Sequence, residues 1–261
     1  GIPDMGISSV RAGTYADCKD CDLIIITAGR NRKRGESRLD LIAGNSAILK
    51  DVVGQMKPYY TKGVIMLVSN PVDVLVYQCT KWMGLPNGMV FGTGCILDSS
   101  RFTRLIADYT HLNTEVVKAT IVGEHGDAQI PIWSRASIAG VPLQEYCENV
   151  GLKWDEEIRK EISDKVREMG ATIIKGKGRT HYGIATCVCY LAEAVLNQRL
   201  TIAPVSTMFQ GEYGIEDVCL SVPSIIGVNG VEKRLEERWA EEEFQAFRQA
   251  ADKMKKVLKT L

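Results

Sequence analysis

Two short apolar runs, separated by a helical pattern, dominate the first third of the chain. Residues 22–27 (DLIIIT) and 64–69 (VIMLVS) are almost continuously hydrophobic, which is typical of strands buried on both faces of a sheet. Residues 39–59 lie between them and repeat hydrophobic side chains at helical spacing. A strand, a helix and a second strand in this order predict parallel strands joined by a crossover helix. A helix over residues 72–83 and a strand over residues 89–92 continue this layer.

Beyond residue 92 the pattern no longer alternates in this regular way. A helix is predicted from Asp98 to about Tyr109, and Asp98 is suited to cap its first turn. The mostly apolar residues 182–196 predict a buried helix. The same patterns predict strands over residues 115–122, 130–134, 201–208 and 218–222, the last two antiparallel, and helices over residues 155–175 and 241–261. We therefore expect an α/β fold in which a parallel sheet is followed by an α+β part.

The loop over residues 27–38 (TAGRNRKRGESR) carries five basic residues against a single acid. Ligands of open α/β sheets bind beyond the carboxyl ends of the strands, where Gly29 and Asn70 lie in this sequence. The whole chain has 32 Lys and Arg against 32 Asp and Glu, and no aromatic residues alternate with the loop's cations, so a nucleic-acid partner is not favoured. The loop suits a small anionic ligand better, and a merely solvated loop is the alternative.

Composition narrows the class of protein further. No apolar run approaches the ~20 residues that a membrane-spanning helix needs, so we expect no membrane partner. Cys18 and Cys21 have the spacing of a redox or zinc-binding pair, but no second pair or histidine at matching spacing accompanies them. We therefore expect no metal, and we expect the eight cysteines to be reduced, mostly buried thiols of a cytoplasmic protein.

His125 is the strongest candidate for proton transfer. The chain has only three histidines, and His125 follows a β-branched run, residues 120–122, with Gly123 and Gly126 on either side. This pattern predicts a strand that ends in a glycine turn and leaves the imidazole at the mouth of a site. Histidine is the side chain that most often acts as a general acid or base. An exposed polar group in a glycine turn is the alternative.

Five motifs place these candidates in a known context. They are TAG…GESR (residues 27–38), VSNPVD (68–73), LDSSRF (97–102), VGEHGD (122–127) and KGRTHYGIA (177–185). In their order and spacing the chain resembles the lactate/malate dehydrogenase family. The resemblance implies an NAD-dependent oxidoreductase of carbohydrate metabolism that acts on a small 2-hydroxy or 2-oxo acid. It also implies a homodimer or homotetramer. Residues 1–92 would be the C-terminal part of an NAD-binding Rossmann domain, and residues 93–261 the α+β substrate domain.

The resemblance also implies roles for individual residues. His125 would be the proton donor and acceptor, Asp98 would hold its imidazole, and Arg38 would polarise the reacting carbonyl. Arg101 would bind the substrate carboxylate as a bidentate pair. Further substrate-binding residues would be Arg32, Asn70 and Thr180. Cofactor-binding residues would be Thr27, Ala28, Gly29, Asn31, Val68, Asn70 and Ile184. A cis peptide bond between Asn70 and Pro71 is expected as well.

Two departures from the family pattern bear on function. The G-x-G-x-x-G turn that cradles the pyrophosphate in this family is absent. Residues 92–97 (GTGCIL) resemble it but lack its third glycine. We therefore expect that the first ~60 residues of the nucleotide-binding domain, the length of two βαβ units, are missing from this sequence. Arg32 stands where lactate enzymes of the family carry glutamine, and this favours malate and oxaloacetate as substrates. Lactate and pyruvate, or another 2-hydroxy acid, are the alternative. A non-catalytic fragment or structural protein is a third hypothesis.

Overall fold

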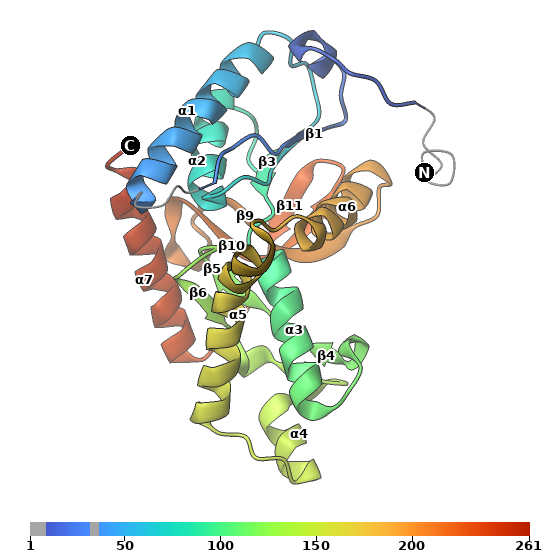
Figure 1. Ribbon diagram of the computed structural model, residues 1–261, viewed down its shortest axis with the longest axis vertical. Coiled ribbons are helices and arrows are strands. Elements are labelled where there is room, and N and C mark those ends of the chain that lie inside the picture. Colours follow the sequence, from blue (N-terminus) through green and yellow to red (C-terminus); the bar gives the residue numbers. More distant parts are fainter. Residues whose placement is uncertain (1–8, 32–36) are drawn as a thin grey trace.

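A mixed sheet runs through the centre of the molecule, and the other elements pack around it (Figure 1). The computed structural model describes residues 9–31 and 37–261. Within this part of the chain the strands follow the order β1 (Leu23–Ile26), β2 (Val64–Leu67), β3 (Val90–Gly92), β9 (Thr201–Gln210), β10 (Glu216–Gly227), β5 (Ile121–Gly123) and β6 (Gln129–Pro131). An additional strand, β11 (Gly230–Arg234), pairs with β10. The fold is therefore α/β, as the sequence predicted.

Helices cover both faces of the parallel strands β1, β2 and β3. On one face lie α1 (Arg38–Met56) and α2 (Val72–Met83), and on the other lies α6 (Tyr182–Leu196). Successive side chains of β2 alternate between these faces: Ile65 and Leu67 pack with α1 and α2, whereas Val64 and Met66 pack with α6. All four are fully buried. Burial on both faces explains the continuous apolar run of β2. The edge strand β1 leaves Ile25 40% exposed. The positions of these strands and helices confirm the sequence prediction.

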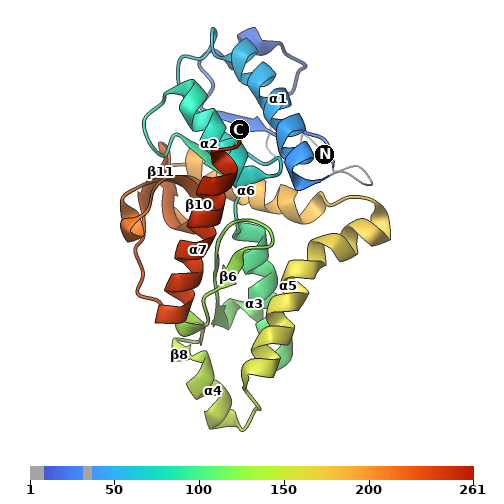
Figure 2. The ribbon, with the colours of Figure 1, turned by 90° about the vertical axis from the view of Figure 1, so that its left-hand side faces the viewer.

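The sheet continues without interruption past residue 92. Gly92 of β3 pairs with Ser206 of β9, which in turn forms a long antiparallel pair with β10, as expected. The last helix, α7 (Glu241–Leu258), covers the antiparallel strands and buries Phe247 and Met254 against them (Figure 2). The strands on either side of residue 92 thus belong to one sheet. The active-site candidates lie along this sheet.

The lower part of the molecule in Figure 1 is built on helices. These are α3 (Ile96–Thr110), α4 (Leu143–Val150) and α5 (Glu156–Lys177), together with a small sheet of β4 (Val117–Lys118), β7 (Ser137–Ile138) and β8 (Val141–Pro142). Asp155 caps α5 by accepting the N–H of Ile158. Phe102 and Ile106 of α3 are fully buried in the core of this part. Through α3 this core reaches the central sheet.

The single strand predicted over residues 115–122 is wrong. A 3-10 turn (Thr114–Val116) comes first, and β4 and β5 then belong to two different sheets. Two side chains of α3 bind backbone groups where the chain passes from β4 to β5. The hydroxyl of Ser99 accepts the N–H of Ile121 at 2.8 Å, and that of Thr103 donates to the carbonyl of Ala119 at 3.4 Å. The sequence pattern could not reveal this break, because five of the seven residues from 116 to 122 are β-branched and they lie on both sides of it.

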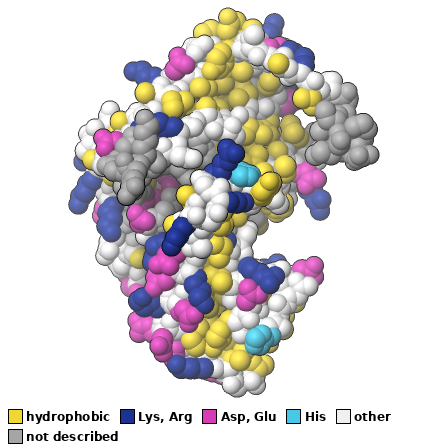
Figure 3. All heavy atoms as spheres, viewed as in Figure 1, with side chains coloured by type: hydrophobic (Ala, Val, Ile, Leu, Met, Phe, Trp, Pro, Cys, Tyr) yellow, Lys and Arg dark blue, Asp and Glu magenta, His cyan; other side chains and the backbone are white. Residues whose placement is uncertain are grey.

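The prediction that α6 is buried is correct for one side of the helix only. Cys187, Leu191 and Val195 are buried against the sheet, whereas 72% of Tyr182 and 47% of Tyr190 are exposed. Hydrophobic side chains also gather across the upper middle of the face shown in Figure 3. This helix therefore carries more apolar side chains than the described part of the chain buries.

The cysteines are all free, and five of the eight are buried. Cys18 and Cys21 are partly buried and Cys189 is exposed, so the expectation of mostly buried thiols holds for most positions. Among residues 9–31 and 37–261 no three His, Cys, Asp or Glu side chains gather as metal ligands would. In the same ranges no helix combines the length and the apolar character needed to span a membrane.

Candidate active site

His125, Asp98 and Arg101 form a hydrogen-bonded cluster beside the central sheet. The Nδ1 atom of His125 lies 2.5 Å from the Oδ2 atom of Asp98, although the two residues are 27 positions apart in sequence. Arg101 donates from Nη1 to the other carboxylate oxygen of Asp98 at 3.3 Å. The side chain of Asp98 is only 4% exposed, and that of Arg101 13%. One buried carboxylate therefore orients both an imidazole and a guanidinium, which confirms the expected closeness of these residues.

Asp98 does not cap α3 as the sequence suggested. Cys95 is the N-cap residue, and Asp98 is the third residue of the helix. From this position in the first turn its side chain reaches the loop between β5 and β6, where His125 lies. The positive end of the helix stabilises a carboxylate here as well. The first turn of α3 thus supplies a buried carboxylate as the partner of the histidine.

Glycine is needed where β5 enters the histidine loop. Gly123 has φ +90°, a conformation that L side chains rarely adopt. A Cβ atom there would lie 2.9 Å from Cδ1 of Ile130 on the paired strand β6. This close approach explains the first glycine of the VGEHGD motif. The turn then holds the backbone of His125 at the end of the sheet.

Asp73 is a positioning residue that the sequence analysis did not single out. Its Oδ2 atom accepts the backbone N–H of His125 at 2.8 Å. Asp73 is the second residue of α2 and is only 2% exposed. The sequence did contain a signal for this role: Asp73 is an acid at the start of a mostly apolar helix, and it lies inside the VSNPVD motif. The histidine is therefore held by two carboxylates, Asp98 at its ring and Asp73 at its backbone.

The surroundings of His125 favour its charged form. Burial lowers the pKa of the imidazole, but the hydrogen bond with Asp98 and the negative charges of Asp98 and Asp73 raise it by more. The positive charge of Arg101 opposes them in part. The pKa of His125 is consequently raised above the ordinary histidine value of 6.5. The raised pKa keeps the imidazolium populated to higher pH, and the quarter-exposed ring can donate this proton to a ligand.

We expect Asp98→Asn to lower the pKa of His125, because the amide has no charge to stabilise the imidazolium. The measurement is an NMR titration of the imidazole signals, with the wild-type chain in parallel. Asp108→Asn is a matched control on α3, since Asp108 is half-exposed and pairs with Arg104 instead. An unchanged His125 titration in Asp98→Asn, or an equal fall in the control, would show that the 2.5 Å contact does not set the charge.

Asn45 joins the loops that follow β1 and β2. This residue of α1 is only 1% exposed. Its Oδ1 atom accepts the N–H of Arg30 at 2.9 Å, and its Nδ2 atom donates to the carbonyls of Arg30 (3.1 Å) and Asn70 (2.6 Å). The Asn70-Pro71 bond is cis, as expected. Nothing in the sequence marked Asn45, because the contact depends on how α1 packs between the two loops.

Replacing Asn45 by leucine is expected to destabilise the fold by about 1–3 kcal/mol, since the apolar side chain leaves backbone groups of both loops without their partner. Urea denaturation followed by circular dichroism measures the free energy of unfolding. Asn149→Ala serves as the control, because Asn149 is exposed on α4. Equal stability of Asn45→Leu and wild type would mean that water replaces these bonds at no cost.

A cavity of about 210 Å³ lies where these pieces meet. It is lined by Leu41, Asn70, Pro71, His125, Gly126 and Asp127. The structure therefore brings together Asn70, which follows β2, and His125, which follows β5. Leu41 adds an apolar wall from the first turn of α1. A small polar molecule in this cavity would contact the histidine ring and the end of the parallel sheet together.

Other candidate residues from the sequence lie around this end of the sheet or outside the described part. Thr27, Ala28 and Gly29 are exposed directly after β1, and Asn31 is exposed further along. Val68 follows β2 and is half-buried. Thr180 is exposed just before α6, and Ile184, in the first turn of that helix, packs in the cluster that contains Leu97. Arg32 lies outside the described residues. Arg38 is the first residue of α1, but its side chain is outside them as well.

The exposed backbone after β1 suits a bound cofactor. A Cβ atom at Gly29 would lie 3.1 Å from Cβ of Ser69, so glycine keeps the two loops close together. The hydroxyl of Ser69 donates to the carbonyl of Ala28 at 2.7 Å and fixes the same approach. The two loops leave an open edge beside Asn70 at the carboxyl ends of the parallel strands, where ligands of open α/β sheets bind.

Comparison with known proteins gives matches along almost the whole chain. A sequence model of the lactate/malate dehydrogenase NAD binding domain matches residues 4–92, and one of the alpha/beta C-terminal domain matches residues 95–261. L-lactate dehydrogenase of Acetivibrio thermocellus is 38% identical over 261 residues, which are 100% of this chain and 82% of that enzyme. L-lactate dehydrogenase of Thermoanaerobacterium saccharolyticum is 41% identical, again over 100% of this chain and over 84% of the relative.

Solved structures give the same picture. The minor L-lactate dehydrogenase of Enterococcus mundtii, in its ligands-bound form, has a TM-score of 0.93 and 37% identity to this chain. The match covers 98% of this chain and 81% of that one. L-lactate dehydrogenase from Clostridium thermocellum has a TM-score of 0.87 at 42% identity, over 100% of this chain and 84% of the other.

Proposed function

Since this chain belongs to the lactate/malate dehydrogenase family, we propose that it interconverts pyruvate and L-lactate with NAD. The observation that carries the proposal is the hydrogen-bonded cluster of His125, Asp98 and Arg101 beside a cavity shared with Asn70. The cluster combines a proton donor with a fixed cation, which are the groups that the protein itself contributes when a bound cofactor reduces a 2-oxo acid. The relatives reported above are named L-lactate dehydrogenase, and this favours pyruvate over oxaloacetate.

In the proposed reaction Arg101 binds the substrate carboxylate and turns the 2-oxo group towards His125. The imidazolium of His125 donates its proton to the carbonyl oxygen as the 2-carbon is reduced, and in the reverse reaction the neutral ring takes the hydroxyl proton. Asp98 keeps the ring oriented and stabilises its charged form. NAD, when bound, supplies or accepts the hydride at the 2-carbon. Arg38 acts on the carbonyl oxygen in the same proposal, through its place in the GESR motif.

The groups that would hold the cofactor lie at the edge of the parallel sheet. We assign this role to the exposed segment Thr27, Ala28 and Gly29 with Asn31, and to Val68 and Asn70 of the next loop. Ile184 would present an apolar surface from α6, and Thr180 would face the substrate. Each of these assignments follows from the motif in which the residue lies.

Interconversion of malate and oxaloacetate is the second candidate function, and one residue favours it. Arg32 stands in the arginine-rich loop at the position where lactate enzymes of the family carry glutamine. A second cation opposite the third carbon of the substrate would form an ion pair with a second carboxylate. This candidate shares every other residue with the first, so only substrate preference separates them.

Steady-state NADH oxidation with pyruvate and with oxaloacetate, on wild type and Arg32→Gln, tests the proposal. We expect wild type to have the higher kcat/KM for pyruvate, with a ratio that Arg32→Gln leaves nearly unchanged. A wild-type preference for oxaloacetate that Arg32→Gln reverses would instead establish the malate reaction. An NADH fluorescence titration without saturation would contradict both and favour a non-catalytic protein.

We also propose that the functional protein is a homodimer or homotetramer. The exposed apolar side of α6, with Tyr182 and Tyr190, and the exposed Leu200 next to it support this proposal. Analytical ultracentrifugation of the chain would contradict it by giving a monomer at micromolar concentration. A cytoplasmic location belongs to the same proposal, because all eight cysteines are free.

A further inference from the structure

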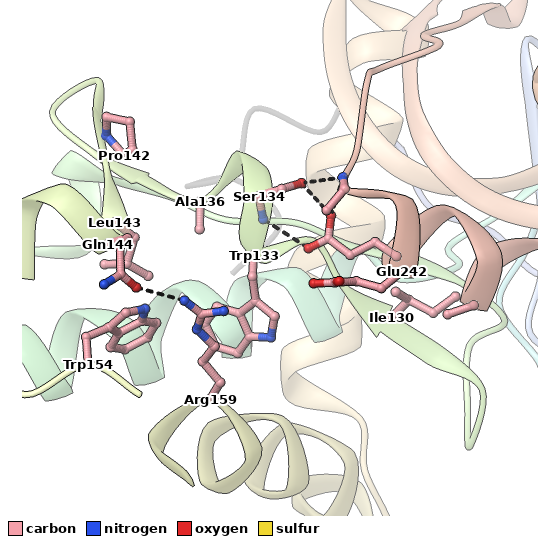
Figure 4. Close-up of a pocket in the computed structure, with 13 residues that line it drawn as sticks. Ile130, Trp133, Ser134, Ala136, Pro142, Leu143, Gln144, Trp154, Arg159 and Glu242 are labelled. Carbon is pink, nitrogen blue, oxygen red and sulfur yellow. Dashed lines mark hydrogen bonds between the residues drawn. The ribbon is translucent and has the colours of Figure 1, made fainter. Parts of the chain in front are cut away.

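A second, larger cavity lies away from the histidine cluster, in the lower part of the molecule. Its volume is about 430 Å³, and it shares no residue with the cavity beside His125. Four segments enclose it: the 3-10 turn that follows β6, the start of α4, the segment leading into α5, and the first turn of α7 (Figure 4). Sites for small molecules typically measure about 300–1,000 Å³, so this cavity has the size of a ligand site.

Two tryptophans give the cavity rigid aromatic walls. The ring of Trp133 packs edge-on against the fully buried Phe102 of α3, with centroids 4.6 Å apart. Trp154 packs against Trp133 at 5.4 Å. Pro142 and Leu143 add apolar surface on the side of α4. Fixed aromatic and aliphatic walls favour a ligand with a flat apolar body, because such a body stacks without losing much conformational freedom.

Arg159 gives the same cavity a cation with an unused donor. Its Nη2 atom donates to Oε1 of Gln144 at 2.8 Å, and its guanidinium lies 5.9 Å from the ring centroid of Trp154. Its Nε atom is buried without a hydrogen-bond partner. Within residues 9–31 and 37–261 no carboxylate forms an ion pair with this guanidinium at contact distance. A carboxylate on a ligand would pair with this charge through the guanidinium Nη groups that face the cavity.

The acidic residues of the cavity restrict the charge of its ligand. Glu243 is buried, and its carboxylate accepts the N–H of Ser134 at 2.9 Å and the N–H of Ala240 at 3.1 Å, as well as the hydroxyl of Ser134. This carboxylate therefore holds the wall together and is already satisfied. Glu242 is exposed and also lines the cavity. Two negative charges on this side disfavour a ligand with a second carboxylate.

From these contacts we propose that the cavity is a binding site for a small aromatic monocarboxylate. The ring lies against Trp133 and Trp154, and the carboxylate binds the guanidinium of Arg159. The site is separate from the proposed substrate site, since it uses neither His125 nor Arg101. It does not depend on which 2-oxo acid the chain reduces.

Isothermal titration calorimetry with 2-naphthoate tests this site. Wild type is expected to bind one 2-naphthoate per chain, and 2-naphthamide, which has the same ring without the charge, should bind much more weakly. Arg159→Met should weaken 2-naphthoate binding by about tenfold or more, as expected for loss of a charge-assisted hydrogen bond. Thermal denaturation checks that each variant is folded.

Two further variants show where the probe binds. Arg135→Met removes an equal charge from an exposed residue beside the cavity that does not line it, and it should leave binding unchanged. Arg101→Met should also leave it unchanged, whereas loss of binding in that variant would place the probe at the substrate site and overturn the proposal. The proposal is equally overturned if wild type shows no saturable binding in the millimolar range, or if 2-naphthamide binds as tightly as 2-naphthoate. The comparison of the two probes needs no variant and so does not depend on how Arg159→Met folds.

Discussion

His125→Gln is expected to lower kcat for the reduction of the 2-oxo acid by about two to four powers of ten, the usual contribution of a positioned general acid. Glutamine retains a hydrogen-bonding amide beside Asp98 but cannot release a proton. Because the backbone N–H that binds Asp73 is unaffected, the loop keeps its anchor. The measurement is the steady-state rate of NADH oxidation at saturating substrate.

The pH dependence of the same rates distinguishes a proton donor from a structural residue. Reduction needs the imidazolium, and the pKa of His125 is raised, so in wild type kcat/KM should be highest below that pKa and fall as the pH rises through it. His125→Gln should abolish this fall. His111→Asn is the control, because His111 is exposed and has a left-handed backbone that asparagine tolerates. Wild-type rates in His125→Gln would remove the proposed mechanism.

The sequence predicted best those elements whose burial follows a simple rule. Strand β2 is buried on both faces, so its apolar run was sufficient. The apolar run of β1 also identified a strand, although this edge strand leaves Ile25 40% exposed. The break between β4 and β5 escaped prediction because hydroxyl groups of α3, at Ser99 and Thr103, bind the backbone there. The side of α6 that is exposed could not be identified either, because composition does not say which other surfaces are present to cover a helix.

The candidate site was likewise predictable only in part from the sequence. Motifs identified His125, Asp98 and Arg101 as candidates, but neither the 2.5 Å contact nor the position of Asp98 inside the helix could be read from spacing. Asp73 and Asn45 were missed because each binds a backbone group of a distant segment. Such contacts carry no sequence pattern of their own, since the backbone is the same at every residue.

Arg101→Met is expected to reduce kcat/KM for the 2-oxo acid by about one and a half to three and a half powers of ten. Removing one partner of a buried, hydrogen-bonded charge pair costs roughly 2–5 kcal/mol, and ~1.4 kcal/mol corresponds to a factor of ten. Among the described residues, Arg101 makes one hydrogen bond, to Asp98 at 3.3 Å, which leaves other N–H groups of its planar guanidinium available to bind a carboxylate in a bidentate pair. Methionine fills a similar volume without either charge or donors.

Arg101→Lys separates charge from geometry in the same experiment, since lysine keeps the charge but lacks the planar pair of donors. We expect it to recover only part of the lost kcat/KM. Arg104→Met is the matched control one turn further along α3, where the ion pair with Asp108 is exposed and contributes only ~0–1 kcal/mol. Full activity of Arg101→Lys would show that charge alone binds the substrate.

A second readout shows whether Arg101 acts beside His125 or merely stabilises the fold. The positive charge of Arg101 lowers the pKa of His125, so its removal in Arg101→Met should raise that pKa further. The loss of reduction rate with rising pH should then move to higher pH, even though kcat/KM is lower throughout. A general loss of stability would reduce the amount of active protein without moving the pH at which the rate falls. If kcat/KM decreases but this pH stays unchanged, Arg101 does not share the charge environment of His125, and its assignment to the substrate carboxylate is wrong.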